Sequence, residues 1–351
     1  MINFAIVGCG RISGKHIEAI EKTTANVIAI CDPNREALQN AKSAIRGNKD
    51  VVFYGGYSDV LKDKAVQVVS LCTPSGLHSE MTIEAAKAGK HVIVEKPMAL
   101  TVRDAYEMIN ACKDNSVQLF VVKQNRYNPP IQELKKAIDE GRFGKIYTAE
   151  ANVKWARDQR YYDQADWRGK VASDGGVLFN QTSHHLDMLR FLVGELDTVF
   201  CKKETFGHKI EAEDTAVGLL IFKNGAIGTY YGTTCAATDL EGSVTIVGEK
   251  GTVKVGGFAM NEMVTWYFRD PIVDDVRIMQ TAVRPPNVYG HGHQPFYKDV
   301  VEALKNNQGP KINGYDAAES VRLVVGLLKS AKEGRPVRLE EIANDDNSYY
   351  Y

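Results

Sequence analysis

The chain has 351 residues, of which 44% are hydrophobic and 25% charged, and its 43 basic and 44 acidic side chains leave a net charge of −1. This composition is ordinary for a globular protein of two domains, and it predicts neither nucleic acid nor a membrane as partner, because the charge is balanced and no apolar run approaches the ~20 residues of a membrane helix. Six scattered cysteines without a Cys-x-x-Cys pair indicate reduced thiols in a cytoplasmic protein.

The first part of the chain, residues 1–122, alternates short apolar runs with helix-like segments. The apolar runs are FAIVG, VIAICD, VQVVSLCTP, HVIVEKP and VQLFVVK. Apolar strands joined through helices indicate a parallel sheet that is covered on both faces. We therefore predict an α/β fold whose residues 1–122 form a doubly wound Rossmann domain.

The second part, residues 123–351, has a different pattern. A helix is predicted at PPIQELKKAIDEG, and alternating strands follow, with hairpin-like turns at KNGA and GEKGT. A helix with a 3.6-residue period is predicted from Val177 to about residue 193. We expect an α+β domain with an open, mainly antiparallel sheet; the family resemblance described below implies that this domain binds substrate and mediates oligomerisation.

A glycine-rich turn, GCGRIS, follows the first predicted strand and opens the first helix. Gly8 permits a tight turn and Gly10 lets the backbone approach a pyrophosphate at the helix N-terminus, and Arg11 and Ile12 of the same turn are expected to contact the cofactor. Asp32 ends the second strand, where it would accept from both ribose hydroxyls and repel a 2′-phosphate, which favours NAD over NADP. The alternative is a flavodoxin-like sheet with an incidental glycine turn.

Lys96 lies at the carboxyl end of a buried strand, in the sequence VEKPMA. Ligands bind in the crevice at this edge of a parallel sheet, and an ammonium there could donate to a substrate hydroxyl as it gains alkoxide character. The Lys96–Pro97 bond is a candidate for a cis peptide. The alternative is an ordinary lysine that extends from a strand end into solvent.

Two adjacent histidines occur in NQTSHHLD, residues 180–187. On the predicted helix Asn180 and His184 are four residues apart and share a face, whereas His185 is turned ~100° away. Asp187 could orient the ring of His184 or only solvate the helix. Either histidine could be a general base or a hydrogen-bonded core residue.

Basic and aromatic residues alternate in KWARDQRYYDQADWRG, residues 154–169. Arg157, Arg160 and Tyr161 belong to this segment, and Lys123 follows the last strand of the first domain. In a neutral protein this local charge suggests an anionic ligand bound by arginine. Single-stranded nucleic acid is disfavoured because there is no global basic excess, and part of the segment is expected to be a solvated loop.

A late glycine-rich motif, VYGHGH, contains Tyr289, His291 and His293. Two histidines without a nearby carboxylate or cysteine make a poor metal site, so no metal is expected. A loop that contacts a phosphate or uracil, or a plain connection, is favoured instead.

The motifs GCGRIS, CTPSGLH, VEKPMA and DGGVLFNQTSHHLDMLRFLVG together resemble the Gfo/Idh/MocA oxidoreductase family over essentially the whole chain. The resemblance implies that NAD lies across the carboxyl ends of the first sheet, with Glu95 near the nicotinamide ribose and Lys96 facing the reacting carbon. The other cofactor contacts that it implies are Thr73, Pro74, His78, Gln124, Trp167 and Arg168.

The same resemblance assigns the catalytic histidine. His184 matches the histidine of the family pattern and is therefore the expected general base, with Lys96 assisting. Asn180 stands where many relatives carry aspartate. An asparagine cannot act as a base, but its amide can orient a hydroxyl.

Within the family, KQNRYNPP, LEGSVTIVGEKGTVKVGG and the Asn-Gln before the histidines resemble the WlbA/WbpB-type enzymes. That resemblance implies oxidation of the 3″-hydroxyl of UDP-N-acetyl-D-glucosaminuronic acid in nucleotide-sugar biosynthesis for surface polysaccharide, retained NAD, reoxidation by 2-oxoglutarate, and a homotetramer. Three alternatives stay open: a UDP-N-acetylglucosamine 3-dehydrogenase, an inositol or simple sugar dehydrogenase, and a non-catalytic NAD-sensing regulator. The expected substrate contacts are Lys96, Lys123, Arg157, Arg160, Tyr161, Asn180, His184, Tyr289 and His291.

Overall fold

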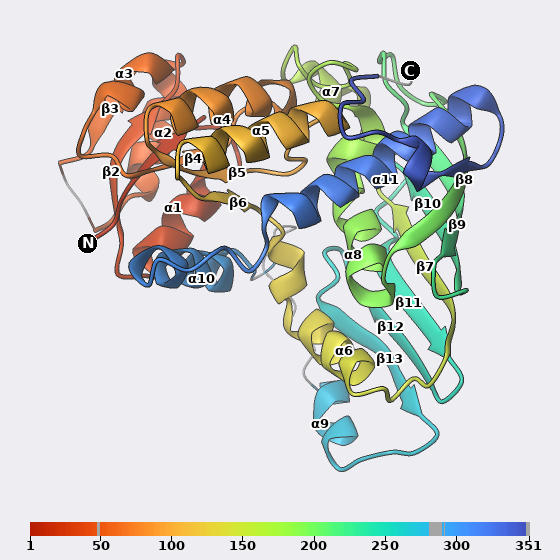
Figure 1. The fold of residues 1–351 in the computed structure, drawn as a ribbon. Helices are drawn as coiled ribbons and strands as arrows, with labels where there is room; N and C mark the ends of the chain where they lie inside the picture. The colour runs from red at the N-terminus through yellow and green to blue at the C-terminus, as the bar shows by residue number, and fades with distance from the viewer. Residues whose placement is uncertain (48–49, 281–289, 291, 349–351) are drawn as a thin grey trace. The chain divides into compact units, whose positions relative to one another are not determined.

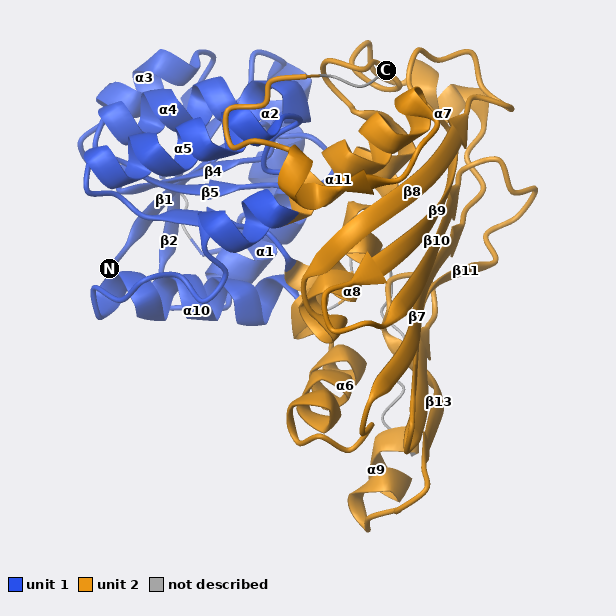
Figure 2. Ribbon diagram, turned by 45° about the vertical axis from the view of Figure 1, so that its right-hand side comes forward, with its two compact units in different colours: residues 1–123, 292–319 blue, residues 124–291, 320–351 orange. Residues whose placement is uncertain are grey.

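The structure is a computed structural model that describes residues 1–47, 50–280, 290 and 292–348 (Figure 1). It contains two compact units, which Figure 2 distinguishes by colour. Unit 1 consists of residues 1–123 and 292–319, and unit 2 of residues 124–291 and 320–351.

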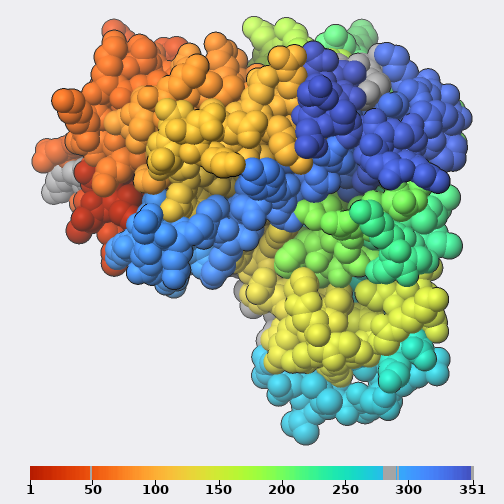
Figure 3. All heavy atoms as spheres, viewed as in Figure 1, coloured from red at the N-terminus to blue at the C-terminus, as the bar shows by residue number. Residues whose placement is uncertain are grey.

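Residues 292–319 belong to unit 1, although the sequence analysis places them in the second domain. The reason is helix α10 (His293–Lys305), which packs against helix α1 (Ser13–Glu21). In the space-filling view α10, in blue, lies against the red N-terminal residues (Figure 3). The apolar side chains of Phe296 and Val300 are buried in this packing, so the chain completes unit 1 only after it has formed most of unit 2.

The sheet of unit 1 has six strands in the order β3-β2-β1-β4-β5-β6, and all neighbouring pairs are parallel. The predicted doubly wound sheet is confirmed. Helices α4 and α5 pack together, and α1 packs with α2 and α10; because the strand order reverses at β1 and crossovers are right-handed, the two groups cover opposite faces. The strands are β1 (Asn3–Val7), β2 (Asn26–Cys31), β3 (Val52–Tyr54), β4 (Val68–Leu71), β5 (His91–Val94) and β6 (Leu119–Val121), and the remaining helices are α2 (Arg35–Ala44), α3 (Tyr57–Lys62), α4 (His78–Lys87) and α5 (Val102–Asp114).

The sheet of unit 2 has eight strands in the order β13-β12-β11-β7-β10-β9-β8-β14. Strands β7 and β10 pair in parallel and the other pairs are antiparallel, so the predicted mainly antiparallel sheet is confirmed. The strands are β7 (Ile146–Lys154), β8 (Leu196–Glu204), β9 (Thr215–Phe222), β10 (Ile227–Thr233), β11 (Glu241–Gly248), β12 (Gly251–Gly256), β13 (Glu262–Phe268) and β14 (Val337–Arg338).

One face of this sheet is covered by helices and the other is open. Along β9 the side chains of Ala216 and Leu220 are buried, whereas Val217 and Leu219 between them are exposed, which is the alternation expected of a sheet with one covered face. The helices of unit 2 are α6 (Pro129–Asp139), α7 (Gln159–Asp163), α8 (Ser183–Val193), α9 (Asp274–Gln280) and the larger part of α11 (Gly314–Glu333). Among the described residues no helix has the length and apolar character needed to cross a membrane.

Candidate active site

The glycine-rich turn of unit 1 connects β1 to α1. Gly8 has φ +89°, and a Cβ at this position would lie 2.7 Å from the main-chain carbonyl of Cys72, so only glycine fits. A Cβ at Gly10 would meet nothing within 4 Å, which leaves the backbone open to a ligand. Exposed Arg11 and half-buried Ile12 complete the turn. This arrangement suits a pyrophosphate at the start of α1.

The carboxylate of Asp32 is held at the end of β2. It accepts the main-chain N–H of Cys9 at 2.8 Å and that of Asn34 at 2.8 Å. A carboxylate has about four acceptor positions, so two such bonds fix its direction and still leave capacity for the paired hydroxyls of an adenosine ribose. The turn and Asp32 together fit NAD.

The segments that follow β4 and β5 are joined by His78, which is buried. Its Nδ1 lies 2.8 Å from the carbonyl oxygen of Pro97 and its Nε2 lies 3.0 Å from that of Thr73. The Lys96–Pro97 peptide is cis, as the sequence suggests, and Lys96 itself is half-buried. The hydroxyl of Thr73 is buried and makes no hydrogen bond within the described residues; Pro74, the next residue, is half-buried.

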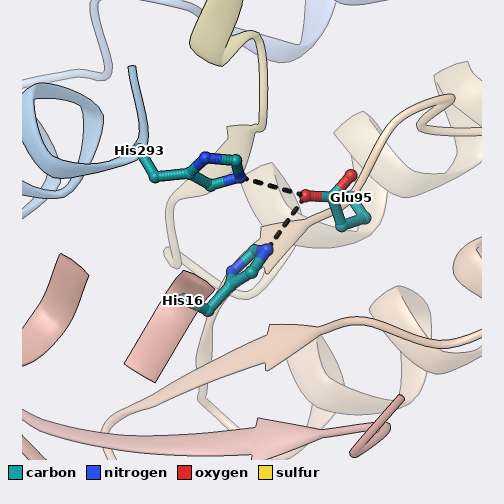
Figure 4. A group of neighbouring side chains, drawn as sticks. All are labelled: His16, Glu95 and His293. Atoms are coloured by element: carbon teal, nitrogen blue, oxygen red, sulfur yellow. Dashed lines mark hydrogen bonds and ion pairs between the residues drawn. The ribbon is translucent and has the colours of Figure 1, made fainter. Parts of the chain in front are cut away.

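Glu95, which precedes Lys96, belongs to a buried polar cluster that the sequence analysis does not foresee (Figure 4). Its Oε1 lies 2.9 Å from Nε2 of His16 and 3.9 Å from Nε2 of His293. On the far side of the ring, His16 Nδ1 lies 2.7 Å from the hydroxyl of Tyr297 and 3.0 Å from that of Ser70. The cluster thus connects α1, β4 and α10 to the end of β5.

In unit 2, the prediction of one continuous helix from Val177 is wrong, because the segment forms two helical elements. Residues Val177–Gln181 form a π-helix, the N–H of Thr182 donates to the carbonyl of Val177 at 2.9 Å, and α8 begins at Ser183. The Thr182 hydroxyl also donates to that carbonyl at 2.8 Å, and such side-chain bonds compete with regular helix bonds. Asn180 and His184 therefore lie in different helical elements, and their four-residue spacing does not by itself place them on one face. Single-turn π-helices frequently mark functional sites.

A buried glutamate holds the start of this π-helix. Glu213 accepts the main-chain N–H of Leu178 at 3.1 Å. Gly176 has φ +75°, and a Cβ there would lie 2.5 Å from the Glu213 carboxylate, so a side chain is excluded. Burial raises the pKa of Glu213 to about 7, against the opposing charge of Lys203 at 3.6 Å and the N–H of Leu178.

His184 and Asn180 each have a polar neighbour that fixes the side chain. The amide nitrogen of Gln124 lies 3.1 Å from Nε2 of His184, where the amide N–H donates and Nε2 accepts. The amide of Asn180 donates to the carboxylate of Asp174, which is buried and also accepts the N–H of Gly169 at 2.8 Å. Both catalytic candidates are half-buried.

The remaining two candidates of this segment, His185 and Asp187, lie in the interior of unit 2. His185 packs edge-on against Trp155, with ring centroids 5.8 Å apart. Asp187 accepts two bonds from the guanidinium of Arg126, at 2.9 and 2.7 Å, and one from the hydroxyl of Ser320 at 2.7 Å. Asp187 therefore connects α8 to Arg126 and Ser320 in the interior of unit 2.

Most of the positive charge in residues 154–169 is neutralised within unit 2. Lys154 pairs with Glu241 at 2.9 Å, Arg157 lies 3.4 Å from Asp239, and exposed Arg160 pairs with Asp158. The acidic partners of the first two come from the loop and strand after residue 238, which the local sequence does not reveal.

Arg168 differs from these three cations, because the described residues provide it with no carboxylate. Its guanidinium stacks on Tyr161 and Trp167, at 4.3 and 4.6 Å from the ring centroids, and donates to the Tyr161 hydroxyl at 2.5 Å. Lys123, at the end of unit 1, is buried. The predicted Tyr289 and His291 lie outside the described residues.

Two groups of described residues could in principle hold a metal ion: His16 with Glu95 and His293, and His208 with Asp214 and Cys235. In the second group the ring nitrogens of His208 lie 2.9 Å from Asp214 Oδ2 and 2.9 Å from the carbonyl of Arg157. Both nitrogens thus face an oxygen already, which accounts for this group by hydrogen bonding alone.

Comparisons with known proteins cover both units. The family described as "Oxidoreductase family, NAD-binding Rossmann fold" matches residues 2–123, and the family described as "GFO/IDH/MocA C-terminal domain" matches residues 131–254. Among curated proteins, the chain is similar to the myo-inositol 2-dehydrogenase of Thermotoga maritima, at 28% identity over 97% of this chain and 99% of that protein.

Two solved structures have higher identities. The WlbA dehydrogenase of Bordetella pertussis, in complex with NADH and UDP-GlcNAcA, is 43% identical, with a TM-score of 0.88 over 96% of this chain and 97% of that one. The WlbA dehydrogenase of Chromobacterium violaceum, with the same two ligands, is 39% identical, with a TM-score of 0.89 over 96% and 95% of the two chains.

Proposed function

Because the chain belongs to the Gfo/Idh/MocA oxidoreductase family and is an NAD-dependent dehydrogenase of sugar or polyol hydroxyls, we propose that it oxidises the 3″-hydroxyl of UDP-N-acetyl-D-glucosaminuronic acid to a ketone. The observation that carries the proposal is the 39–43% identity, over nearly the whole chain, to two dehydrogenases crystallised with NADH and UDP-GlcNAcA. The inositol dehydrogenase is 28% identical over a similar length. The biological setting that we propose is nucleotide-sugar biosynthesis for surface polysaccharide.

In the proposed reaction bound NAD supplies the hydride acceptor. His184 takes the proton of the 3″-hydroxyl, which its Nε2 can do in the tautomer that carries the ring proton on Nδ1. In the structure this nitrogen is hydrogen-bonded to the amide of Gln124. In the proposed reaction the substrate hydroxyl replaces the amide as its partner. Lys96 donates to the reacting oxygen and lowers the free energy of its alkoxide character.

Asn180 positions the sugar instead of moving a proton. Its amide donates to buried Asp174, so the amide oxygen is directed away from that carboxylate. It can accept from a neighbouring hydroxyl or from the N-acetyl N–H of the substrate. Lys123, Arg157, Arg160 and Tyr161 are retained as proposed substrate contacts.

Arg168 is the side chain that we propose for an anionic group of a bound nucleotide. It is the cation of residues 154–169 whose charge no described carboxylate neutralises, and its stacking on Tyr161 and Trp167 fixes the guanidinium plane. The other proposed cofactor contacts are Gly8, Gly10, Arg11, Ile12, Asp32, Thr73, Pro74, His78 and Gln124.

A panel of sugars tests the proposal. The purified protein is incubated with NAD and UDP-N-acetyl-D-glucosaminuronic acid, UDP-N-acetylglucosamine or myo-inositol, and the absorbance of the reduced nicotinamide is followed. We expect the uronic acid to be oxidised with the highest kcat/KM. Faster oxidation of UDP-N-acetylglucosamine would support oxidation of the same hydroxyl, with UDP-N-acetylglucosamine as the substrate. Oxidation of inositol alone would support the second candidate, an inositol dehydrogenase, which the Thermotoga maritima relative favours.

If none of these sugars reduces NAD, the result would support the non-catalytic regulator instead. The presence of both Lys96 and His184 favours the enzyme, since a sensor of NAD needs neither group. We also propose that 2-oxoglutarate reoxidises the bound cofactor, which the same absorbance assay checks by loss of the reduced signal when 2-oxoglutarate is added.

We further propose a homotetramer. Its support is the open face of the eight-stranded sheet, which exposes large apolar side chains at 43–50% of their full area. These side chains are Val217, Leu219, Ile227 and Val264. Contiguous exposed apolar surface commonly marks a protein interface. Light scattering on the eluted protein measures the mass, and a monomer would refute this assignment.

A further inference from the structure

The carboxylate of Glu95 is directed into unit 1, and both of its oxygens already have partners. Oε1 accepts from His16 Nε2 at 2.9 Å, and Oε2 accepts the main-chain N–H of Lys96 at 3.0 Å. The side chain is 8% exposed. It therefore has little surface with which to meet a hydroxyl of the cofactor.

Glu95 and His16 form an ion pair. Burial alone would raise the pKa of Glu95, but the hydrogen bond to His16 at 2.9 Å holds it well below its usual range. Burial likewise opposes protonation of His16, yet Cys72, Tyr297 and Glu95 raise the pKa of its ring well above the usual value. A buried carboxylate is tolerated when a paired and hydrogen-bonded cation compensates it.

The ring of His16 is itself fixed by its second nitrogen. Nδ1 lies within hydrogen-bond distance of the hydroxyls of Tyr297 and Ser70, which are 2.9 Å from each other. Tyr297 is fully buried, one helical turn after His293 on α10. A continuous chain of hydrogen bonds thus runs from α10 and β4, through His16 and Glu95, to the backbone of Lys96.

We propose that Glu95 is a positioning residue: held by His16 and Tyr297, its carboxylate fixes the main chain at Lys96, and it is not a ligand of the cofactor's ribose. The inference rests on the catalytic role proposed for Lys96. A side chain that acts at a reacting carbon has to be held to within about 0.5 Å, and supporting hydrogen bonds of this kind provide that accuracy.

A metal ion is the other occupant that this chemistry would permit. The ligand atoms of His16, Glu95 and His293 lie within 4.8 Å of one another. However, His16 and Glu95 already bond directly, and the group offers three ligands where a structural zinc site uses four. Hydrogen bonding therefore accounts for His16 and Glu95, whereas neither ring nitrogen of buried His293 has a hydrogen-bond partner among the described residues.

Two substitutions test the proposal in the full-length protein, with NADH affinity measured by fluorescence and kcat and KM measured on whichever sugar the wild type oxidises. Tyr297→Phe keeps the buried ring and removes only the hydroxyl; we expect kcat to fall about fivefold, as for one lost hydrogen bond, with KM unchanged. Glu95→Gln should lower kcat about tenfold or more and leave the NADH Kd within about twofold. Because the two residues act in one chain, the double variant should lose no more kcat than the worse single variant.

Tyr57→Phe is the matched control. Tyr57 is also in unit 1, and its hydroxyl donates to the carbonyl of Met81 at 2.7 Å instead. If the hydroxyl of Tyr297 only stabilises the fold, both variants lower the melting temperature and neither changes kcat. If it positions Lys96 through Glu95, only Tyr297→Phe changes kcat.

Three results would overturn the proposal. Wild-type kcat in Tyr297→Phe would show that the chain of bonds has no bearing on catalysis. A tenfold weaker NADH Kd in Glu95→Gln at normal kcat would make Glu95 a ribose ligand. One equivalent of metal in the wild type, lost in His293→Asn, would make the cluster a metal site.

The failure of this inference can be told apart from the failure of the proposed function. If the protein oxidises inositol and not a UDP-sugar, the proposed substrate is refuted, but kcat of the variants can still be compared with that of the wild type on inositol. Lys96→Met is measured alongside: an impaired Lys96→Met with a normal Tyr297→Phe refutes the inference alone, whereas a normal Lys96→Met removes the role of the lysine on which it rests.

Discussion

Glu213, beneath the π-helix of unit 2, should make the stability of the protein fall as the pH rises through neutrality. The side chain is buried, with one oxygen on the N–H of Leu178 and the other 3.6 Å from Lys203. That second oxygen makes no hydrogen bond within the described residues. Glu213→Gln keeps the size and an acceptor for Leu178 and removes the titrating proton.

The sign and size follow from the raised pKa. Burial raises the pKa of Glu213 from its ordinary 4.5 to about 7, so between these values the folded protein holds a proton that the unfolded chain has lost. The stabilisation is complete below pH 4.5 and disappears as the pH passes 7. Each pKa unit is worth about 1.4 kcal/mol, so the whole effect is about 3 kcal/mol.

Urea unfolding at several pH values between 5 and 8, followed by tryptophan fluorescence, measures the effect. All three tryptophans, Trp155, Trp167 and Trp266, lie in unit 2 with Glu213, so the signal reports the unit that is perturbed. From pH 5 to pH 8 the free energy of unfolding of Glu213→Gln should rise relative to wild type by about 2–3 kcal/mol.

The control is Glu204→Gln, at the exposed end of β8 in the same unit, which should show no such trend. A difference between Glu213→Gln and wild type that is constant across this pH range would refute the reasoning, because it would mean that Glu213 has the same proton affinity folded and unfolded.

Three further substitutions test the site. His184→Asn should lower kcat by about 10²–10⁴-fold, as expected for a positioned proton acceptor, and leave NADH bound; steady-state kinetics with a fluorescence titration would expose an unchanged kcat, which is incompatible with a general base. Lys96→Met should lower kcat roughly 10²-fold through the lost donor, whereas an effect confined to KM would assign the lysine to binding. Arg126→Met leaves the buried carboxylate of Asp187 without its two-bond partner and should destabilise unit 2 by about 3–5 kcal/mol in urea unfolding; a change below about 1 kcal/mol would mean that the pair contributes little.

The architecture could be predicted because its pattern is local. Five of the six strands of unit 1 are continuous apolar runs that are largely buried, and β9 of unit 2 alternates buried and exposed side chains. The remaining strand, β3, is short and partly exposed, and it is not among the predicted runs. The glycine turn at Gly8 and Gly10 and the acid at Asp32 are recognisable for the same reason, since each is tied to a strand end. Lys96 and His184 could be named from motifs, although their catalytic roles stay proposals.

What the sequence did not reveal depends on residues distant along the chain. His16 and Tyr297 are in contact across 281 positions, and nothing near His16 in the sequence marks it as more than a helix residue. The start of the π-helix is held by Glu213, which is 35 positions from the N–H that it accepts. The ion pairs of Lys154 and Arg157 likewise depend on acids some 80 positions later, so the basic segment seemed more available to a ligand than it is.

The return of the chain to complete unit 1 has a consequence for biosynthesis. After residue 123 the ribosome adds about 170 residues before α10 emerges, which at typical elongation rates takes roughly 10–30 s. During that interval nascent unit 1 lacks the helix that covers α1 and the tyrosine that steadies His16. A stalled chain ending near residue 290 should therefore be captured by chaperones and cut by proteases within its first 123 residues, at sites that the finished protein protects.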